Sequence, residues 1–506
     1  MASFFTSCKF QVGSEGNNAD ASIAVGESFP ENVDETPEEQ GIYTYADLGG
    51  YTYQAYVYGS GSGSSVMVCE DFWTEDPSGD YLKYAVYARN TYIENTYHCK
   101  ISQVDSKDLS TYNELKKFYL NGEQYELCII PTMDAAACAT SALLCNVYEL
   151  ENIKLQNTAY DQNSIGQLAV GGKLYYLSGD MNVSMMDAAA VTCFNSALYR
   201  EYDFEKKIGD GKAAYNDPYQ MVHDGTWTLE NMLKIAAEVD HDRDKSGTLD
   251  ATVGDKVGFF QHNSTPLFYW FGLGARLTEN DPKNGGYPAI AFDSDKGEDT
   301  FALLYDNLNT AVEHPERAIG GGGDRKESFK TGNILFFDII LWDVRKVYRP
   351  AEYEYGILPL PKADVDQTRY FDIVYNPSRV ERIWAIPTTC ANRDYASFLL
   401  NVIAVYSARS ESTMDVYFRI TLSTASQNDT HAYATLHTVR NSLTYDYCLL
   451  YDWGDFITEQ LSKLSTSSFN TYADATAKEM LDLANAEMNR TLKGFKVPTP
   501  PVPEKE

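Results

Sequence analysis

Residues 125–150 read YELCIIPTMDAAACATSALLCNVYEL, and this stretch decides the fold class. It opens with a run of apolar residues at 127–131, which is typical of a strand buried on both faces. The alanine-rich remainder has the composition of a helix. A strand that passes directly into a helix predicts a parallel sheet covered by helices.

The same alternation continues on both sides. Upstream, YTYQAYVYG at 51–59 and SVMVCEDF at 65–72 are predicted strands around a serine- and glycine-rich, hairpin-like turn, and YAVYARNTYIENTY at 84–97 has helical spacing. Downstream, KLYYLSGD at 173–180 is predicted to be a strand. The repeated order of strand and helix predicts an α/β fold with a mostly parallel sheet.

A second α/β region follows. TWTLENMLKIAAEV at 226–239 predicts a helix, because Thr228 can cap its start and apolar residues then recur at helical spacing. Trp227 and Trp384 are expected in the core. Further strands and helices are expected at 329–344, 353–362, 394–408 and 471–492.

The charge balance limits the kinds of partner. The chain of 506 residues carries 72 acidic and 41 basic side chains, a net charge of -31. Nucleic acid and anionic membrane surfaces are disfavoured, because both are bound through clustered cations. No apolar run approaches the roughly 18 residues of a membrane helix. The nine cysteines form no CxxC pair and are expected mainly as buried thiols.

Both ends of the chain are predicted to be disordered. Residues 1–42 form a polar, acidic tether, and 496–506 a proline-rich tail. FFTSC at 4–8 resembles the end of a bacterial lipoprotein signal, with Cys8 as the lipid anchor. The apolar region that precedes such a cysteine is missing, since Met1–Phe5 is too short. An incidental cysteine therefore remains the alternative.

DRDKSGTLD at 242–250 has the alternating oxygen ligands of a calcium loop, with Gly247 at the sharp turn. Val253 stands where a bidentate glutamate belongs, and Asp255 could replace it if the loop bulges. The expected ligands are Asp242, Asp244, Ser246, Thr248 through its carbonyl, Asp250 and Asp255. A solvated acidic turn is the alternative. No nucleophile and base accompany the loop, so a bound calcium would have a structural role.

An ordered set of segments from Tyr43 to Lys493 resembles the extracellular solute-binding proteins (family 1, sugar-binding-like) of bacterial ABC importers. The stretch 423–448 departs from the family pattern. The segments that carry the resemblance are GGKLYYLSGDMNVSMMDAAAVTCFN (171–195), DPYQMVHDGTWTLENMLKIAAEV (217–239), the aspartate-rich loop with DKVGFF (255–260), ESFKTGNILFF (327–337), YEYGILPLPK (353–362) and ERIWAIPTT (381–389).

The resemblance implies a two-lobed clamp of the periplasmic-binding-protein type (type II), in which the chain crosses between the lobes several times. Lobe one would hold residues 43–176 and 371–420, and lobe two 177–370 and 421–495. A ligand between two rigid bodies suits transport, because closure around it can signal occupancy to a membrane partner.

The implied function is a receptor at the bacterial cell surface that captures a small solute, an oligosaccharide, for ABC permease subunits. It is not an enzyme, and membrane contact would come only through the lipid anchor. A surface adhesion or structural clamp protein and a secreted glycoside hydrolase are the alternatives; the latter needs two carboxylates at a set separation.

Sugar sites combine aromatic faces with carboxylates and amides. By resemblance, the contacts would come from loops after the strands of both lobes. The candidates in lobe one and at the crossing are Glu70, Asp71, Trp73, Asp134, Asp180 and Asn182. Those in lobe two are Asn263, Tyr269, Trp270, Phe337 and Trp342.

Overall fold

The computed structural model describes residues 41–59, 69–107, 110–261, 264–281, 287–292, 294–308, 325–348, 353–374, 381–422, 430–453 and 477–495. Cys8, Asn263, nearly all of the predicted tether and the whole predicted tail lie outside these residues. The described residues belong to one compact unit.

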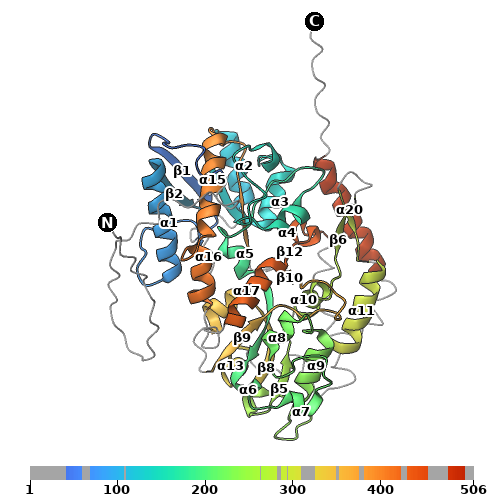
Figure 1. The fold of residues 1–506 in the computed structure, drawn as a ribbon. Coiled ribbons are helices and arrows are strands. Elements are labelled where there is room, and N and C mark those ends of the chain that lie inside the picture. The colour runs from blue at the N-terminus through green and yellow to red at the C-terminus, as the bar shows by residue number, and fades with distance from the viewer. Residues whose placement is uncertain are drawn as a thin grey trace, which may run out of the picture. The chain divides into compact units, whose positions relative to one another are not determined.

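The first sheet has four strands in the order β11-β3-β1-β2; Figure 1 shows β1 and β2 of this sheet side by side next to α1. β1 (Tyr51–Val57) pairs in parallel with β2 (Cys99–Asp105) and with β3 (Leu127–Pro131). β11 (Arg382–Ala385) is antiparallel to β3 although about 250 residues separate them. We call this sheet and the helices packed on it the first lobe.

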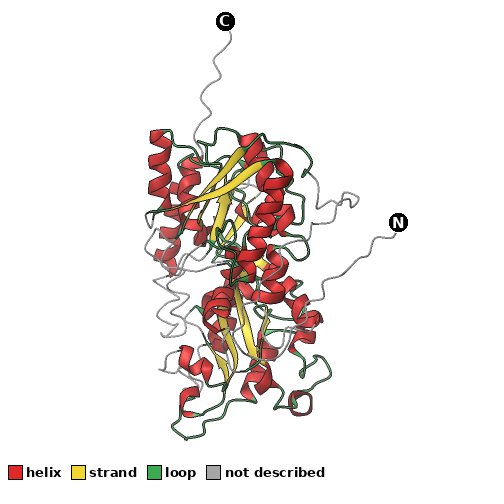
Figure 2. Ribbon diagram, turned by 90° about the vertical axis from the view of Figure 1, so that its left-hand side faces the viewer, coloured by secondary structure: helices red, strands yellow, loops and turns green. Residues whose placement is uncertain are grey.

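The second sheet has the order β5-β8-β4-β9. β4 (Ala190–Asn195) is antiparallel to β8 (Ile334–Ile340) and to β9 (Tyr355–Leu358), and β5 (Val257–Phe260) is parallel to β8. Every residue of β4 and β8 is buried, as expected of central strands covered on both faces. We call this sheet and its helices the second lobe; Figure 2 shows the strands of the two sheets as separate groups flanked by helices.

Two short ladders lie outside the main sheets. β10 (Asp372–Ile373) pairs with β12 (Leu443–Thr444), and β6 (Thr278–Asp281) pairs with β7 (Tyr287–Ile290). The longer helices are α1 (Tyr81–Tyr97), α2 (Thr111–Asn121), α3 (Thr132–Thr140), α9 (Leu229–Ala237), α10 (Thr265–Gly272), α11 (Asp295–Leu308), α15 (Arg393–Ser407), α17 (Thr430–Ser442) and α20 (Ala477–Phe495). The shorter helices and turns are α4 (Gln162–Leu168), α5 (Val183–Asp187), α6 (Ser196–Tyr199), α7 (Phe204–Ile208), α8 (Pro218–His223), α13 (Arg325–Lys330), α14 (Leu341–Asp343), α16 (Thr413–Val416), α18 (Tyr447–Tyr451), the 3-10 turns η3 (Val147–Glu149) and η4 (Ala251–Val253), and the π-helical turns η6 (Val344–Tyr348) and η7 (Tyr417–Thr421).

The chain crosses between the lobes several times. It leaves the first lobe through α5, which leads into β4, and it returns to the first sheet at β11. It leaves again after α15 through α16 and η7 to α17, which packs on β9 and α8 of the second lobe. α18 and α20 then contact α3 of the first lobe, and α20 also contacts β7. The predicted crossings are therefore present, while the residue boundaries of the lobes stay a prediction.

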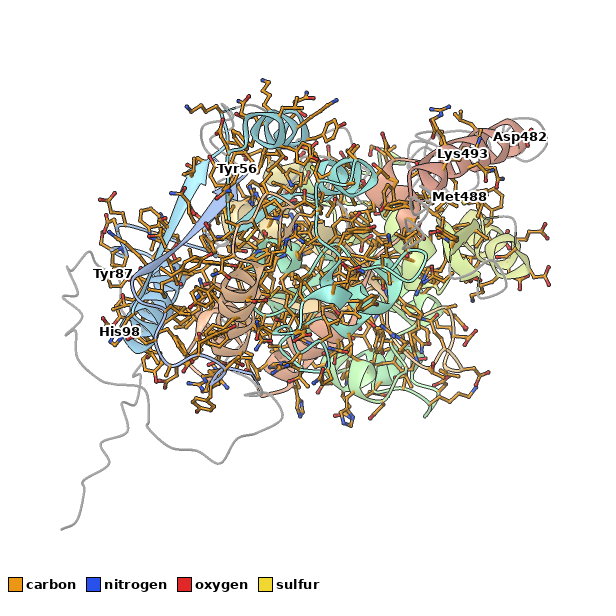
Figure 3. All side chains as sticks on the ribbon, turned by 90° about the horizontal axis from the view of Figure 1, so that it is seen from above. Tyr56, Tyr87, His98, Asp482, Met488 and Lys493 are labelled. Carbon is orange, nitrogen blue, oxygen red and sulfur yellow. The ribbon has the colours of Figure 1, made fainter. Side chains whose placement is uncertain are left out.

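Caps and burial explain the helices that the sequence predicted. The Thr228 hydroxyl accepts a hydrogen bond from the Asn231 amide (3.3 Å) at the start of α9, and Asn392 caps α15 in the same way. α20 buries Ala484, Met488 and Leu492 at a spacing of four residues. Its exposed Asp482 and Lys493 mark the outer face of this helix in Figure 3.

The predicted turn after β1 and the first half of the predicted strand at 65–72 lie outside the described residues, and β1 itself pairs in parallel with β2 and β3. Two other expectations about local structure are wrong. Residues 173–180 form isolated bridges, such as Leu177 with Trp384, and no strand. The helix predicted in 135–150 ends at Thr140, and the chain turns at Ala142 with a positive φ of 56°.

The core contains the aromatic and sulfur side chains that the sequence placed there. Trp227 and Trp384 have no exposed surface. The eight cysteines among the described residues are buried and unpaired in disulfides. No described helix has the length and apolar character needed to cross a membrane.

The expected cleft position of Tyr269 and Trp270 is wrong, since every side chain of α10 is buried. Trp270 is 0% exposed and stacks on Phe292 with ring centroids 4.9 Å apart. The hydroxyl of Tyr269 donates to Asp338 in β8 (3.1 Å). Both aromatic residues therefore pack α10 onto the second sheet, and their burial does not support a ligand contact.

Replacing Trp270 with Ala is expected to lower the free energy of unfolding by about 3–5 kcal/mol, because a large buried side chain leaves a cavity. Urea unfolding measures this change. Tyr119→Ala, at a side chain that is 52% exposed on α2, is the control and should change stability by less than about 0.5 kcal/mol. Equal effects of the two substitutions would contradict the core position of Trp270.

Asp338 is a buried carboxyl in the middle of the second sheet. It accepts hydrogen bonds from the hydroxyls of Thr192 (2.9 Å), Thr265 (2.9 Å) and Tyr269 (3.1 Å). Burial raises its pKa to about 7, although these three donors oppose the shift. The neutral acid therefore fits this site better than the carboxylate does.

Because the pKa of Asp338 is higher in the folded protein than in the unfolded chain, its contribution to stability is complete below about pH 4. That contribution falls by at most about 1.4 kcal/mol per pH unit as the pH rises to about 7. Asp338→Asn should flatten the dependence of the unfolding free energy on pH in this window. Parallel curves for wild type and variant would contradict the assignment.

Candidate ligand site

A partly open cavity of about 350 Å³ lies between α17 and the segment that contains α16 and η7. α16 and η7 contact α1 of the first lobe, and α17 contacts β9 of the second. Thr158 and Asp180, which precede the crossing at α5, complete the wall. The volume falls in the range of about 300–1,000 Å³ that is usual for small-molecule sites.

Asp180 is the predicted ligand residue that lines this cavity. Its Oδ1 accepts a hydrogen bond from Nε of Arg440 (2.9 Å) and forms an ion pair with a terminal nitrogen of the same guanidinium (2.8 Å). That nitrogen donates to the carbonyl of Thr158 (2.8 Å). Burial raises the pKa of Asp180, and Arg440 opposes this shift. No described residue donates a hydrogen bond to Oδ2, so this oxygen is available to a hydroxyl of a ligand.

A second carboxylate, Asp415, is fully engaged. Its Oδ1 accepts from Nε of Arg419 (2.6 Å) and from the hydroxyl of Tyr433 (2.8 Å), and its Oδ2 accepts from the amide of Glu411 (2.9 Å). Burial opposes ionisation of Asp415, but these partners hold its pKa below the usual value. The guanidinium of Arg419 lies 4.2 Å from the ring centre of Tyr433, so charge and aromatic surface meet on this wall.

His437 lies between two aromatic rings in the cavity. The centroids of Tyr433 and Phe418 are 4.6 and 5.3 Å from its own, both edge to face. Burial and the nearby Arg440 lower its pKa, so the imidazole is neutral near pH 7. Neither ring nitrogen forms a hydrogen bond with a described residue. His437 can therefore offer one donor and one acceptor to a ligand.

This combination suits a polyhydroxylated ligand. Asp180 and His437 offer acceptors and a donor for hydroxyl groups, while Phe418 and Tyr433 supply apolar surface for the C–H faces of a sugar ring. Because each carboxylate is paired with an arginine, the walls carry balanced charge. The cavity can hold a neutral saccharide without leaving a buried charge unpaired.

Two further predicted residues lie at a second contact between the lobes, away from the cavity lining. Glu70 follows β1 in the chain and forms ion pairs with Arg345 and Lys346 of η6. Trp342 of α14 is half-buried and packs against Tyr58, the residue that directly follows β1. The C-terminal ends of β1 and β8 therefore meet here.

Three predicted polar residues form buried internal contacts instead of facing the cavity. Asp71 accepts from the amide of Ser184 (2.9 Å), and Asn182 caps α5 and donates to the carbonyl of Arg382 (2.7 Å). Asp134 accepts from both the amide (2.8 Å) and the hydroxyl (2.6 Å) of Thr111. These contacts stabilise the ends of helices and the crossing, so ligand contact by these three side chains stays only a prediction.

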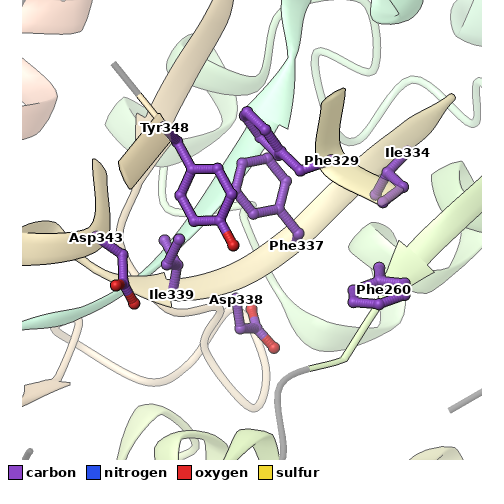
Figure 4. Close-up of a pocket in the computed structure, with 8 residues that line it drawn as sticks. All are labelled: Phe260, Phe329, Ile334, Phe337, Asp338, Ile339, Asp343 and Tyr348. Carbon is purple, nitrogen blue, oxygen red and sulfur yellow. The ribbon is translucent and has the colours of Figure 1, made fainter. Parts of the chain in front are cut away.

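Trp73 is half-buried and packs on the core. Phe337 lies in the second lobe beside the rings of Phe329 (4.5 Å between centroids) and Tyr348 (6.2 Å), around a cavity of about 20 Å³ (Figure 4). This volume is about that of one water molecule. A saccharide does not fit there, so Phe337 is in the wrong place for the expected contact.

Most residues of the larger cavity were missed by the sequence analysis. Tyr433, His437 and Arg440 follow one another at helical spacings of four and three residues, so they share one face of α17. That face was a readable signal, but it lies in the stretch 423–448 that departs from the family pattern. On the other wall of the cavity, Asp415 and Arg419 are four residues apart and form an ion pair.

The aspartate-rich loop brings together three of its six predicted calcium ligands. Side-chain oxygens of Asp242, Asp244 and Asp255 lie within 4.8 Å of one another. Asp255 therefore lies close to the two loop aspartates, while its own oxygens accept hydrogen bonds from the amides of Arg243 (2.8 Å) and Asp250 (2.9 Å). The Asp250 side chain instead accepts hydrogen bonds from the amide (2.8 Å) and the hydroxyl (2.6 Å) of Thr252, and it thereby caps the start of η4.

The remaining two predicted ligands, Ser246 and Thr248, bond to each other within the loop: Oγ of Ser246 donates to the carbonyl of Thr248 (3.0 Å). The amide of Gly247 donates to Asp242 (2.8 Å) and lowers the pKa of that carboxyl. Calcium binding by the loop stays a prediction.

Comparisons with known proteins identify the fold. No protein-family model and no curated protein sequence matches the chain. Among solved structures, the sugar-binding protein MalE from the phytopathogen Xanthomonas citri covers 88% of this chain and 100% of its own, with 12% identity and a TM-score of 0.54. A cyclo/maltodextrin-binding protein complexed with maltotetraose covers 88% of this chain and 99% of its own, with 14% identity and a TM-score of 0.53.

The extracellular solute-binding protein from Staphylococcus aureus in complex with maltose covers 88% of this chain and 98% of its own, with 11% identity and a TM-score of 0.53. At these identities the likeness concerns the fold, and the resemblance read from the sequence is confirmed at that level. The chain has the two-lobed α/β fold of these sugar-binding proteins.

Proposed function

We propose that this protein is an extracellular receptor that captures a saccharide, an oligosaccharide in particular, and delivers it to the permease of an ABC importer. The observation that carries the proposal is the cavity of about 350 Å³ with Asp180 and His437 beside two aromatic side chains. Structural similarity also supports the proposal, because proteins of the same fold were solved with maltose and maltotetraose.

The position of the cavity fits a receptor that closes around its ligand. Phe418 and Arg419 come from η7, which contacts α1 of the first lobe, whereas His437 and Arg440 come from α17, which contacts β9 of the second. A ligand that contacts both walls stabilises the arrangement in which they are close. Closure of this kind supplies the signal that a permease needs.

The geometry favours binding over hydrolysis. A glycoside hydrolase needs two carboxyl groups, one as acid and one as base or nucleophile. Asp180 has one free oxygen and a raised pKa, but both oxygens of Asp415 are occupied by donors. A second working carboxylate is therefore lacking among the described residues that line the cavity. The proteins of similar fold reported above are likewise named as binding proteins.

We place the receptor at the bacterial cell surface, anchored to the membrane through a lipid on Cys8. The support is the sequence FFTSC before a polar, acidic segment. Mass spectrometry of protein extracted from the native membrane tests this assignment, because lipidation of Cys8 adds a diacylglyceryl mass to the mature N-terminus. An unmodified Cys8 in such a sample would contradict it.

Replacing His437 with Ala is expected to weaken the binding of maltotetraose at least about tenfold, because one donor and one acceptor are lost from the cavity. Calorimetry measures the affinity. Thr438→Ala is the matched control, since Thr438 lies next to His437 on α17 but outside the cavity lining and its hydroxyl bonds only to the carbonyl of Ala434 (3.3 Å). The control should bind like the wild type.

A panel of oligosaccharides distinguishes the proposal from its alternatives. Binding without product supports the receptor, and release of shorter sugars would identify a hydrolase. Failure of every saccharide to bind would contradict the proposal and favour an adhesion or structural protein.

We also propose a structural calcium ion in the loop of Asp242, Asp244 and Asp255. Millimolar calcium should then raise the melting temperature of the chelator-treated protein, because a ligand that binds only the folded state stabilises it. Asp244→Asn should abolish the increase while changing the calcium-free melting temperature little, since Asp244 is exposed. Equal melting temperatures with calcium and with EDTA would contradict the site.

A further inference from the structure

Two π-helical turns occur in the described part of the chain, η6 (Val344–Tyr348) and η7 (Tyr417–Thr421). Such turns are rare in proteins, and those that occur often lie at functional sites. Both are bonded to one carboxylate, Asp187, at the end of α5. Arg345 of η6 contacts both oxygens of Asp187, with 3.1 Å from its Nε to Oδ1, and the hydroxyl of Tyr417 in η7 donates to Oδ1 (2.8 Å).

Arg345 also joins the second lobe to the first. One of its terminal nitrogens donates to Oε2 of Glu70 (2.5 Å), and Nζ of Lys346 donates to both oxygens of the same carboxylate (2.9 and 2.8 Å). The segment that carries Glu70 is fixed to the first lobe, because buried Arg89 of α1 donates to the carbonyls of Asp71 (3.1 Å) and Phe72 (2.9 Å).

The contact is buried enough to matter energetically. The side chains of Arg345, Asp187 and Glu70 are 7%, 3% and 16% exposed. Separating the lobes here would remove Glu70 from both cations, while Arg345 would keep Asp187. Removing one partner of a buried ion pair is costly, because the other charge loses its compensation.

The Glu70 carboxyl of this contact stays ionised near neutral pH. Burial opposes ionisation of Glu70, but Arg345 and Lys346 hold its pKa at about 2. Arg345 and Lys346 face Glu70 from η6, and Asp187 of α5 binds the same Arg345. Mechanical separation is therefore what breaks the contact.

The same π-helical turn reaches the ligand cavity. Tyr417 points to Asp187, and the next two residues, Phe418 and Arg419, line the cavity. A molecule held against Phe418 and Arg419 fixes the position of η7. That position in turn sets the contact of Tyr417 with Asp187 and, through Asp187, the guanidinium of Arg345.

We propose that Glu70 and Arg345 form a latch that holds the two lobes closed, and that Asp187 and Tyr417 couple the latch to occupancy of the cavity. Arg345 and Tyr417 are positioning residues in this scheme. The coupling rests on the proposed function, whereas the latch itself does not, so the two parts have separate tests.

The first test needs no ligand. Glu70→Gln keeps the shape of the side chain but removes its charge. Amide hydrogen exchange in 344–348 of the ligand-free protein should become at least about tenfold faster, and small-angle scattering should give a larger radius of gyration. Glu354→Gln is the matched control, because Glu354 pairs with Arg200 at an exposed site within the second lobe. Equal exchange rates in the two variants would overturn the latch.

The second test measures coupling with maltotetraose as the probe. Tyr417→Phe removes only the hydroxyl, and Tyr199→Phe is its control, since buried Tyr199 donates to the carbonyl of Tyr215 (2.6 Å) outside this network. Glu70→Gln and Tyr417→Phe should each weaken binding about fivefold, because the closed state that binds is less populated.

The double variant with Glu70→Gln and Tyr417→Phe should weaken the binding of maltotetraose by less than the product of the two single fold-changes, as expected of residues in one network. A loss equal to the product would overturn the coupling. If the wild type does not bind maltotetraose or any other saccharide of the panel, the proposed function and the coupling fail together, while the exchange experiment still decides the latch.

Discussion

The attachment of α5 to both lobes is the constraint on which the rest of this structure depends. At its start, Asn182 donates to the carbonyl of Arg382 in β11 (2.7 Å), and the amide of Ser184 donates to Asp71 (2.9 Å). At its end, Asp187 binds Arg345 of the second lobe. Because Asp180 precedes this helix by three residues, the same short segment places one carboxylate in the cavity and another at the contact between the lobes.

Three aspartates that are largely shielded from solvent show how their hydrogen-bond partners determine what they can do. Asp338 meets only hydroxyl donors, and its pKa rises to about 7. Asp180 meets one arginine on one oxygen, which leaves the other oxygen available to a ligand. Asp187 is held by an arginine of η6 and a tyrosine of η7, two segments that lie far apart in the chain. The first is suited to stability, the second to binding and the third to transmitting movement.

The sequence predicted the regular elements better than the site. The run 127–131 is apolar at every position and the run 334–340 at every position except Asp338, which allows few structures other than a central strand. The caps of α9 and α15 are local signals. The order of the first sheet could not be predicted in this way, because β11 pairs with β3 across about 250 residues. Local pattern contains no information on such a pairing.

The site candidates failed for a related reason. Polar residues after strands were expected to face a ligand, but Asp71 and Asn182 bond to main-chain groups that only the folded chain brings near them. Trp270 has the residue type of a sugar contact, yet it lies in a helix that is buried on all sides. Asp180 lines the cavity because it lies at a crossing of the chain, where side chains from both lobes meet, and its contact with a ligand stays a prediction.

The abundance of tyrosine, 38 residues in the chain, is explained in part by contacts between distant segments. In the C-terminal region the hydroxyl of Tyr445 donates to Asp161 (2.6 Å), that of Tyr447 donates to the carbonyl of Ala169 (2.5 Å), and that of Tyr451 bonds to Tyr176 (2.7 Å). Between them, Asp446 accepts from the amides of Leu277 (3.0 Å) and Thr278 (2.9 Å). A tyrosine buries a large apolar ring and still satisfies a polar partner at its tip. These contacts tie the last crossing of the chain to segments before α5 and after α10. A relative movement of the lobes that kept this region intact would separate surfaces elsewhere, and the ion pairs of Glu70 lie at such a surface.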